Sequence, residues 1–112
     1  VFGHIPLFLD SASEPDLYYD KAKTELKNME TSQRKKYLKL FEKYHVNAVI
    51  TGHMHRNEHG QYKDVEMITT SAVGEALGKD PRGLRILVFD NNKMTQHFYS
   101  LDNVPEHVNL EQ

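Results

Sequence analysis

The chain has 112 residues, of which 38% are hydrophobic and 27% are charged, a composition typical of a single globular domain. Fourteen basic and sixteen acidic residues leave a net charge of −2, which argues against nucleic acid and an anionic membrane as partners, and no apolar run is long enough to span a bilayer. Cysteine is absent, which excludes disulfides and thiolate metal sites and favours a cytoplasmic protein.

The first predicted element is residues 1–6, VFGHIP, which read as the end of a buried strand that stops at Pro6. Because the chain opens on a strand rather than on methionine, we expect a fragment of a longer protein. Residues 7–20 predict a polar loop in which Ser13 of SEPD is typical of a helix cap, and residues 21–29, KAKTELKNM, indicate a short helix.

The clearest helix is predicted over residues 32–45, with Thr31 or Ser32 as its N-cap. Its large apolar side chains recur at i, i+3, i+4 and i+7 and predict one buried stripe: Tyr37, Leu40, Phe41 and Tyr44. Residues 46–52, VNAVITG, then predict a short buried strand. A strand, a helix and a strand in this order indicate a βαβ unit with parallel strands.

The second half of the chain predicts mostly β-structure. Residues 53–64 read as a polar loop, 65–73 as a strand and 74–83 as a glycine-rich loop. Residues 84–90 and 93–101 predict the two strands of a hairpin around DNN, followed by an irregular tail or a weak terminal helix. The expected fold class is therefore α/β with a mixed sheet.

Three histidines lie where predicted parallel strands end. His53 and His55 follow the glycine that closes the second strand, and His4 follows the glycine of the first. Alternate residues of an extended segment point to one side, and parallel neighbours end at the same sheet edge, so the three imidazoles are expected to converge. Three neutral imidazoles suit zinc, iron or manganese. The alternatives are solvated loop histidines and a structural His4 that caps its strand.

The polar residues that follow are weaker candidates. Arg56 could bind phosphate oxygens bidentately, or it could be an exposed loop charge, and Asn57 could contact phosphate or support the ligands. His59 is expected to face solvent. The other histidines, His45, His97 and His107, are expected to be structural.

Several stretches together resemble one known family. A strand ending in GH, a βα unit and a strand ending in GHMH resemble the last two sequence blocks of the calcineurin-like metallophosphoesterases. HIPLF, GHMHRN, TTSAVGEALGKDPRGLRI and HFYSLD are similar to the C-terminal half of the calcineurin-like phosphoesterase domain-containing serine/threonine phosphatases. By this resemblance residues 1–112 are the C-terminal half of a metallophosphoesterase domain.

The resemblance implies part of a four-layer α/β/β/α sandwich with two metal ions (manganese, iron or zinc) between its sheets. His4 and His53 would ligate one ion and His55 the other, and a metal-bridging hydroxide would attack the phosphate ester of a phosphorylated protein or a small molecule. The family's other ligands come from three earlier blocks, Asp-x-His, Gly-Asp-x-x-Asp and Gly-Asn-His-Asp/Glu, and none of these occurs in the 112 residues. The chain alone is therefore expected to be inactive, with apolar surface that favours self-association or pairing with the missing half.

Two further interpretations stay open at this point. One is a non-catalytic protein-interaction module on the same fold. Finding the missing aspartates and asparagine in residues upstream of Val1 would argue against it. The other is a mononuclear zinc hydrolase built on His4, His53 and His55, which predicts activity of this chain by itself.

Overall fold

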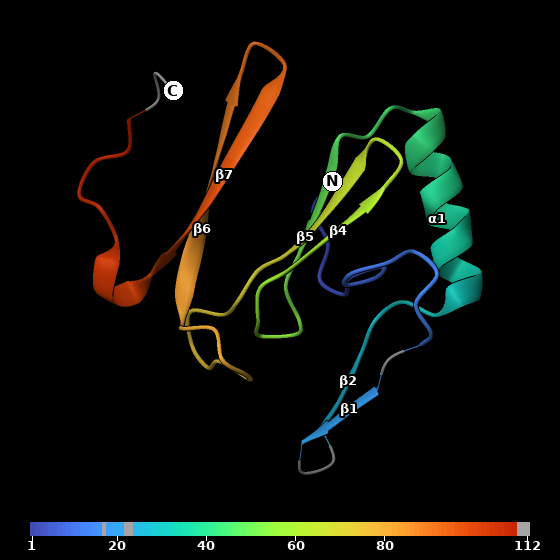
Figure 1. Ribbon diagram of the computed structural model, residues 1–112, viewed down its shortest axis with the longest axis horizontal. Helices are drawn as coiled ribbons and strands as arrows, with labels where there is room; N and C mark the ends of the chain where they lie inside the picture. The colour runs from blue at the N-terminus through green and yellow to red at the C-terminus, as the bar shows by residue number, and fades with distance from the viewer. Residues whose placement is uncertain (17, 22–23, 110–112) are drawn as a thin grey trace.

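Three layers of secondary structure lie side by side in the computed structural model, which describes residues 1–16, 18–21 and 24–109. Helix α1 (Thr31–Lys43) covers one face of a three-stranded sheet, and the hairpin of β6 (Gly83–Asp90) and β7 (Lys93–Ser100) covers the other (Figure 1). Over the described residues, no helix has the length and apolar character that crossing a bilayer requires.

The central sheet is mixed, as predicted. Its strands are β3 (Ala48–Thr51), β4 (Glu58–Tyr62) and β5 (Val65–Thr69), in the order β3-β5-β4, with β3 parallel and β4 antiparallel to β5. The strand prediction for 46–52 is confirmed, because all four residues of β3 are buried. The prediction of a loop over 58–62 is wrong. Gly60 is buried because β4 lies there against Phe8 and Asp10, too close for a side chain. Since a glycine stands where an ordinary strand has an apolar side chain, the sequence shows no apolar alternation that would predict β4.

The first residues of the chain run parallel to β3 on its outer side. Phe2 pairs with Ile50, and the Gly3 N–H donates to the Ile50 carbonyl at 3.0 Å. The expected parallel alignment is therefore confirmed, but residues 1–6 make only this isolated bridge and do not form the predicted strand. The expected burial is also wrong, because Val1 is 51% and Phe2 70% exposed at the edge of the sheet.

Helix α1 is confirmed, but its predicted buried stripe is wrong. The buried residues are Arg34, Leu38 and Phe41, and they face a core formed by the sheet and the loop before it: Leu7, Phe8, Val49, Val65 and Met67. Three of the four predicted stripe residues are exposed: Tyr37, Leu40 and Tyr44. The reason is Arg34, since a pattern that counts only apolar residues cannot place a buried arginine at the centre of the face.

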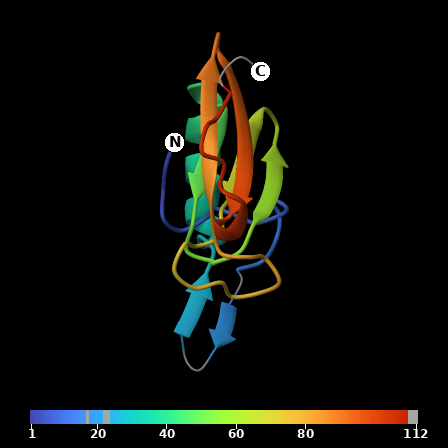
Figure 2. The same ribbon diagram turned by 90° about the vertical axis from the view of Figure 1, so that its left-hand side faces the viewer.

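The predicted caps are also wrong. The N-cap residue is Glu30, which makes no side-chain cap hydrogen bond, and the Thr31 N–H instead donates at 2.8 Å to the Asp16 carboxylate. Ser13 does not begin a helix. The predicted short helix over 21–29 is wrong where the chain is described: β1 (Tyr18–Lys21) pairs antiparallel with β2 (Thr24–Lys27), and the two strands project from the body of the molecule (Figures 1 and 2). Residues 22 and 23 of that prediction lie outside the described residues. A nine-residue run is too short to hold a helix without packing.

The predicted C-terminal hairpin is confirmed. Its turn residues Asn91 and Asn92 have φ values of 46° and 64°, and two consecutive positive values suit the twist of a two-residue hairpin turn. Leu87 and Met94 pack against the sheet residues Ala48, Ile50 and Ile68. A 3₁₀ turn (Leu101–Asn103) follows, and the tail is irregular up to residue 109.

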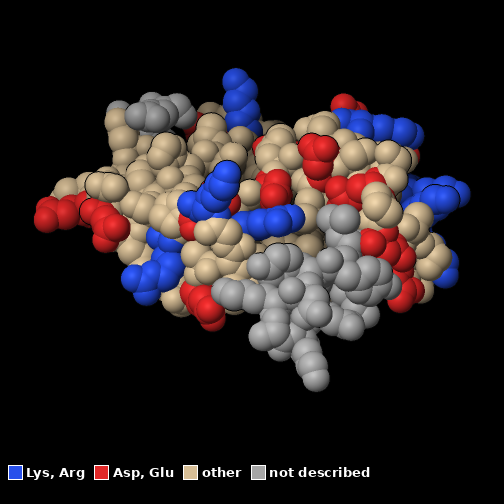
Figure 3. Space-filling view, turned by 60° about the horizontal axis from the view of Figure 1, so that its bottom comes forward, with Lys and Arg blue, Asp and Glu red and all other residues tan. Residues whose placement is uncertain are grey.

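The resulting molecule is a thin slab with principal dimensions of 42 × 39 × 16 Å, seen edge on in Figure 2. On the face shown in Figure 3, acidic and basic side chains are interspersed. This distribution agrees with the net charge of −2 and gives that face no broad field of one sign.

Candidate metal centre

His4 and His53 meet at the carboxyl edge of the sheet. Nδ1 of His53 lies 3.0 Å from Nε2 of His4, and the two rings stand at 72° with centroids 4.8 Å apart. The Gly52 N–H donates to the His4 carbonyl at 3.2 Å, which ties the ends of the two parallel segments together. The expected convergence of these two imidazoles is confirmed, because parallel neighbours end at one edge.

The loop after β3 is not extended, so the reason given for pairing His53 with His55 is wrong. Both histidines have a left-handed backbone conformation, with φ values of 64° and 52°, and residues 53–56 form a bend. Met54 between them is only 4% exposed and packs against Leu9 and Leu77. The buried Met54 fixes the loop between the two histidines. The backbone there bends around this contact and does not continue as the expected extended strand.

His55 is held through its backbone. Its carbonyl accepts hydrogen bonds from the Leu77 N–H at 3.0 Å and the Ser71 hydroxyl at 3.4 Å. Its side-chain Nδ1 is buried and has no hydrogen-bond partner in the described structure. A buried imidazole nitrogen without a partner is costly, so this atom is an unsatisfied polar group of the loop.

Nδ1 of His53 and Nε2 of His4 lie at hydrogen-bonding distance, so in this structure one imidazole donates to the other. Their separation of 3.0 Å is at the lower end of the roughly 3.0–3.4 Å between two nitrogens that share an ion at about 2.1 Å, so a bound ion would have to replace this hydrogen bond. Burial, with the charges of His4 and then His55, lowers the pKa of His53, so its imidazole is neutral at neutral pH, the state that binds metals. Within the described ranges, no three histidine or carboxylate side chains come close enough to enclose an ion.

Arg56 and Asn57 have different surroundings. Arg56 Nε lies 3.0 Å from Glu58 Oε1, an ion pair without hydrogen-bond alignment, at the half-exposed rim of the loop. The side-chain oxygen of Asn57 accepts hydrogen bonds from the Ser71 N–H and from Arg85 Nη2, each at 2.9 Å. Asn57 is therefore committed to protein contacts, whereas Arg56 stands where its guanidinium remains half accessible.

Sequence reasoning missed three residues that surround Asn57. Besides Ser71 and Arg85, Asp80 accepts the Asn57 N–H at 2.9 Å. The available signal was an arginine inside the apolar strand LRILVF, since a charge in a strand that is otherwise apolar needs a polar partner.

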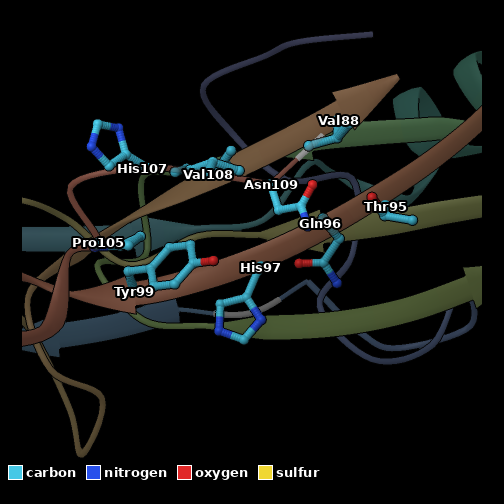
Figure 4. A pocket seen from close by; sticks show the side chains of 10 residues that line it. Val88, Thr95, Gln96, His97, Tyr99, Pro105, His107, Val108 and Asn109 are labelled. Atoms are coloured by element: carbon cyan, nitrogen blue, oxygen red, sulfur yellow. The ribbon is translucent and has the colours of Figure 1, made fainter. Parts of the chain in front are cut away.

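The remaining histidines lie away from the candidate centre. His59 is 55% exposed, as expected, with Nε2 2.8 Å from Glu66 Oε1. His97 and His107 line a separate pocket of 210 Å³ on the outer face of the β6–β7 hairpin (Figure 4). The ring centroids of His97 and Tyr99 are 4.4 Å apart. The imidazoles of His97 and His107 do not point toward each other in Figure 4.

Comparison with known proteins finds relatives of this chain by sequence. No family model and no solved structure matches the chain. The chain is 43% identical over 106 residues to the serine/threonine-protein phosphatase CPPED1 of Homo sapiens, covering 95% of the chain and 32% of that protein. The proteins of the same name from Bos taurus and Danio rerio are 42% and 37% identical over 95% of the chain, which covers 31% and 32% of them. The resemblance expected from the motifs is confirmed: the chain is a homologue, over about one third of their length, of the calcineurin-like phosphoesterase domain-containing serine/threonine phosphatases.

Proposed function

We propose that this chain supplies part of the metal centre of a phosphoesterase that hydrolyses phosphorylated proteins or small phosphate esters. The observation that carries the proposal is the imidazole pair of His4 and His53, whose nitrogens are 3.0 Å apart at the carboxyl edge of parallel strands. Relatives at 37–43% identity are named serine/threonine-protein phosphatases, which supports the reaction class.

In this proposal the three histidines divide between two ions. His4 Nε2 and His53 Nδ1 would hold one ion, and the imidazole of His55, whose Nδ1 is buried in this structure, would ligate the second. Bound manganese, iron or zinc would supply Lewis acidity toward the phosphate and lower the pKa of water. The lowered pKa of His53 keeps its ring neutral for this role, and Arg56 lies near enough along the chain to meet phosphate oxygens.

The remaining ligands would come from residues outside this chain. The resemblance assigns the carboxylates and an asparagine to earlier sequence blocks, and the chain covers about one third of its relatives. In the same proposal the α1 layer, the central sheet and the β6–β7 hairpin belong to a four-layer α/β/β/α sandwich. The exposed Phe2 and Phe89 support a further covering element, because both lie on one open apolar side of the slab.

Metal binding and hydrolysis test this function separately. We expect the chain to bind manganese or zinc in elemental analysis after dialysis, and the His53→Ala/His55→Ala variant to lose the ion. In the longer protein, the same double substitution should abolish hydrolysis of an aryl phosphate with added manganese. Full hydrolysis by the double variant would refute the proposal. Hydrolysis by the 112-residue chain alone would instead favour a mononuclear zinc enzyme.

A further inference from the structure

Arg85 is a half-buried cation whose partners are neutral. On β6, its Nη2 donates to Asn57 Oδ1 at 2.9 Å, its Nη1 donates to Gln96 Oε1, and its guanidinium lies 5.5 Å from the centre of the Phe98 ring. No carboxylate in the described part of the chain lies within ion-pair distance of it. Burial lowers the pKa of Arg85, opposed by the charge of Glu66, yet arginine stays protonated at any physiological pH. Because a half-buried cation is partly desolvated, its two amide hydrogen bonds and the charge of Glu66 offset the cost of its position.

The hydrogen bonds of Arg85 lead to the histidine loop. The Asn57 oxygen that Arg85 contacts also accepts the Ser71 N–H, and these two donors identify that atom as oxygen rather than nitrogen. The Ser71 hydroxyl has one proton and two carbonyl acceptors within reach, that of Pro81 at 3.1 Å and that of His55 at 3.4 Å. Arg85 is therefore two residues from the histidine site: Asn57 and Ser71 connect it to His55.

The loop that these contacts support is strained. His53 and His55 both have positive φ, which costs a non-glycine residue on the order of 1 kcal/mol each. The apolar Met54 anchor fixes only the middle of the loop, so the polar contacts must fix its far end. Residues that orient ligands from outside typically change metal affinity about 10–100-fold when they are mutated.

We propose that Arg85 is a positioning residue of the histidine site. Through Asn57 it holds Ser71 against the His55 carbonyl and keeps the loop in its left-handed conformation. Its role at a metal rests on the function proposed above, whereas its role in holding the loop does not.

Four variants of the chain, among them Asn57→Ala, test this role. Arg85→Gln removes the guanidinium, and Arg85→Lys keeps the charge but loses the planar fork that reaches both amide oxygens. Arg82→Gln is the matched control, because Arg82 is an exposed arginine three residues away. Amide hydrogen exchange at Ser71 and Leu77 reports on the loop without any metal, and calorimetric titration with Zn²⁺ reports on the histidines.

We expect Arg85→Gln to accelerate exchange at Ser71 and Leu77 about ten-fold and to weaken Zn²⁺ binding about 10–100-fold. Arg85→Lys should give smaller changes in both, and Arg82→Gln should match the parent. If Arg85→Gln no longer unfolds cooperatively, amide exchange at Ser71 and Leu77 is measured in Arg85→Lys and Asn57→Ala instead. Exchange rates in these two variants equal to those of the parent would overturn the inference. A parent chain that binds no Zn²⁺ would count against the proposed function, while the exchange measurements would still test Arg85.

Discussion

Glu14 organises the loop that leads into the molecule. Its carboxylate accepts hydrogen bonds from the N–H groups of Leu9, Asp10 and Ser11, at 2.6, 3.0 and 3.2 Å, and from the Asn28 amide at 2.9 Å. Burial acts to raise the pKa of Glu14, but these four hydrogen bonds together lower it below its ordinary value of 4.5. The ionised carboxylate therefore stabilises the fold.

Replacement of this carboxylate gives a prediction with a defined pH dependence. Because the pKa of Glu14 is lower in the folded state, its contribution is complete above the unfolded value of 4.5 and is lost as pH falls through the folded value. Glu14→Gln should thus lower the free energy of unfolding at pH 7 and flatten its decline between about pH 5 and pH 3. Urea unfolding at several pH values measures this, with the exposed Glu106→Gln as control. An equal decline in parent and Glu14→Gln would contradict the prediction.

Gly60 shows a second requirement on a single residue. A Cβ built there would lie 2.6 Å from Phe8 Cε2 and 2.7 Å from the Asp10 carbonyl oxygen, closer than such atoms approach. Gly60→Ala should lower the free energy of unfolding by about 1–3 kcal/mol, because the loop over β4 must move. Gly74→Ala is the control, since a Cβ there meets nothing within 4 Å. Equal thermal unfolding midpoints for the two variants would show that the loop yields without cost.

At the scale of elements, the sequence patterns predicted the presence of a helix or strand better than they predicted which of its faces is buried. The α1 helix, β3 and the β6–β7 hairpin follow from local periodicity and from the Asn91–Asn92 turn. The buried face of α1 does not follow from local periodicity, because it depends on Arg34. The Arg34 guanidinium donates to three carbonyls that lie before the helix in sequence, those of Ala12, Glu14 and Met29. Local patterns contain no information on such partners.

Arg34 also gives a prediction for α1 as an element. Arg34→Met keeps the length of the side chain but leaves the carbonyls of Ala12 and Met29 without their donor, so the free energy of unfolding should fall by about 1–3 kcal/mol. Lys35→Met removes a charge from the exposed neighbour on the same helix and should change it by less than about 0.5 kcal/mol. Denaturant unfolding compares the two variants. Equal stability would mean that packing alone, without these hydrogen bonds, holds α1 on the sheet.

The candidate centre was predictable in part for the same reason. His4 and His53 follow strand-ending glycines, and the parallel βαβ rule brings such residues together. The left-handed conformation of His53 and His55 was not predictable, because it depends on Met54 packing and on Ser71. The pairing of Asn57 with Arg85 joins residues 28 apart in sequence, and only the complete fold creates it.

The whole molecule leaves one apolar groove open at its edge. A pocket of 460 Å³ lies between the sheet-edge residues at the start of the chain and the turn of the β6–β7 hairpin. Phe2 and Phe89, at 70% and 67% exposure, line it together with Ala48, Ile50 and Met94, and the polar residues of the hairpin turn line it as well. The free side of residues 1–3 continues the sheet edge beside it. Exposed apolar surface next to an unpaired strand edge favours association.

This groove predicts that the chain associates with itself in solution. At increasing concentration its sedimentation coefficient should rise, because a second copy can cover Phe2 and Phe89 and extend the sheet edge. Phe2→Lys and Phe89→Lys should each shift the equilibrium toward the monomer, since a buried lysine without a partner opposes association. Leu40→Lys is the matched control: Leu40 is 46% exposed, but it lies on α1 in the opposite layer, so this variant should associate like the parent. If Leu40→Lys alone abolished association, the contact surface would be α1 and the groove would be a solvated feature. If the parent were monomeric at every concentration, the open groove would not suffice to hold a second copy.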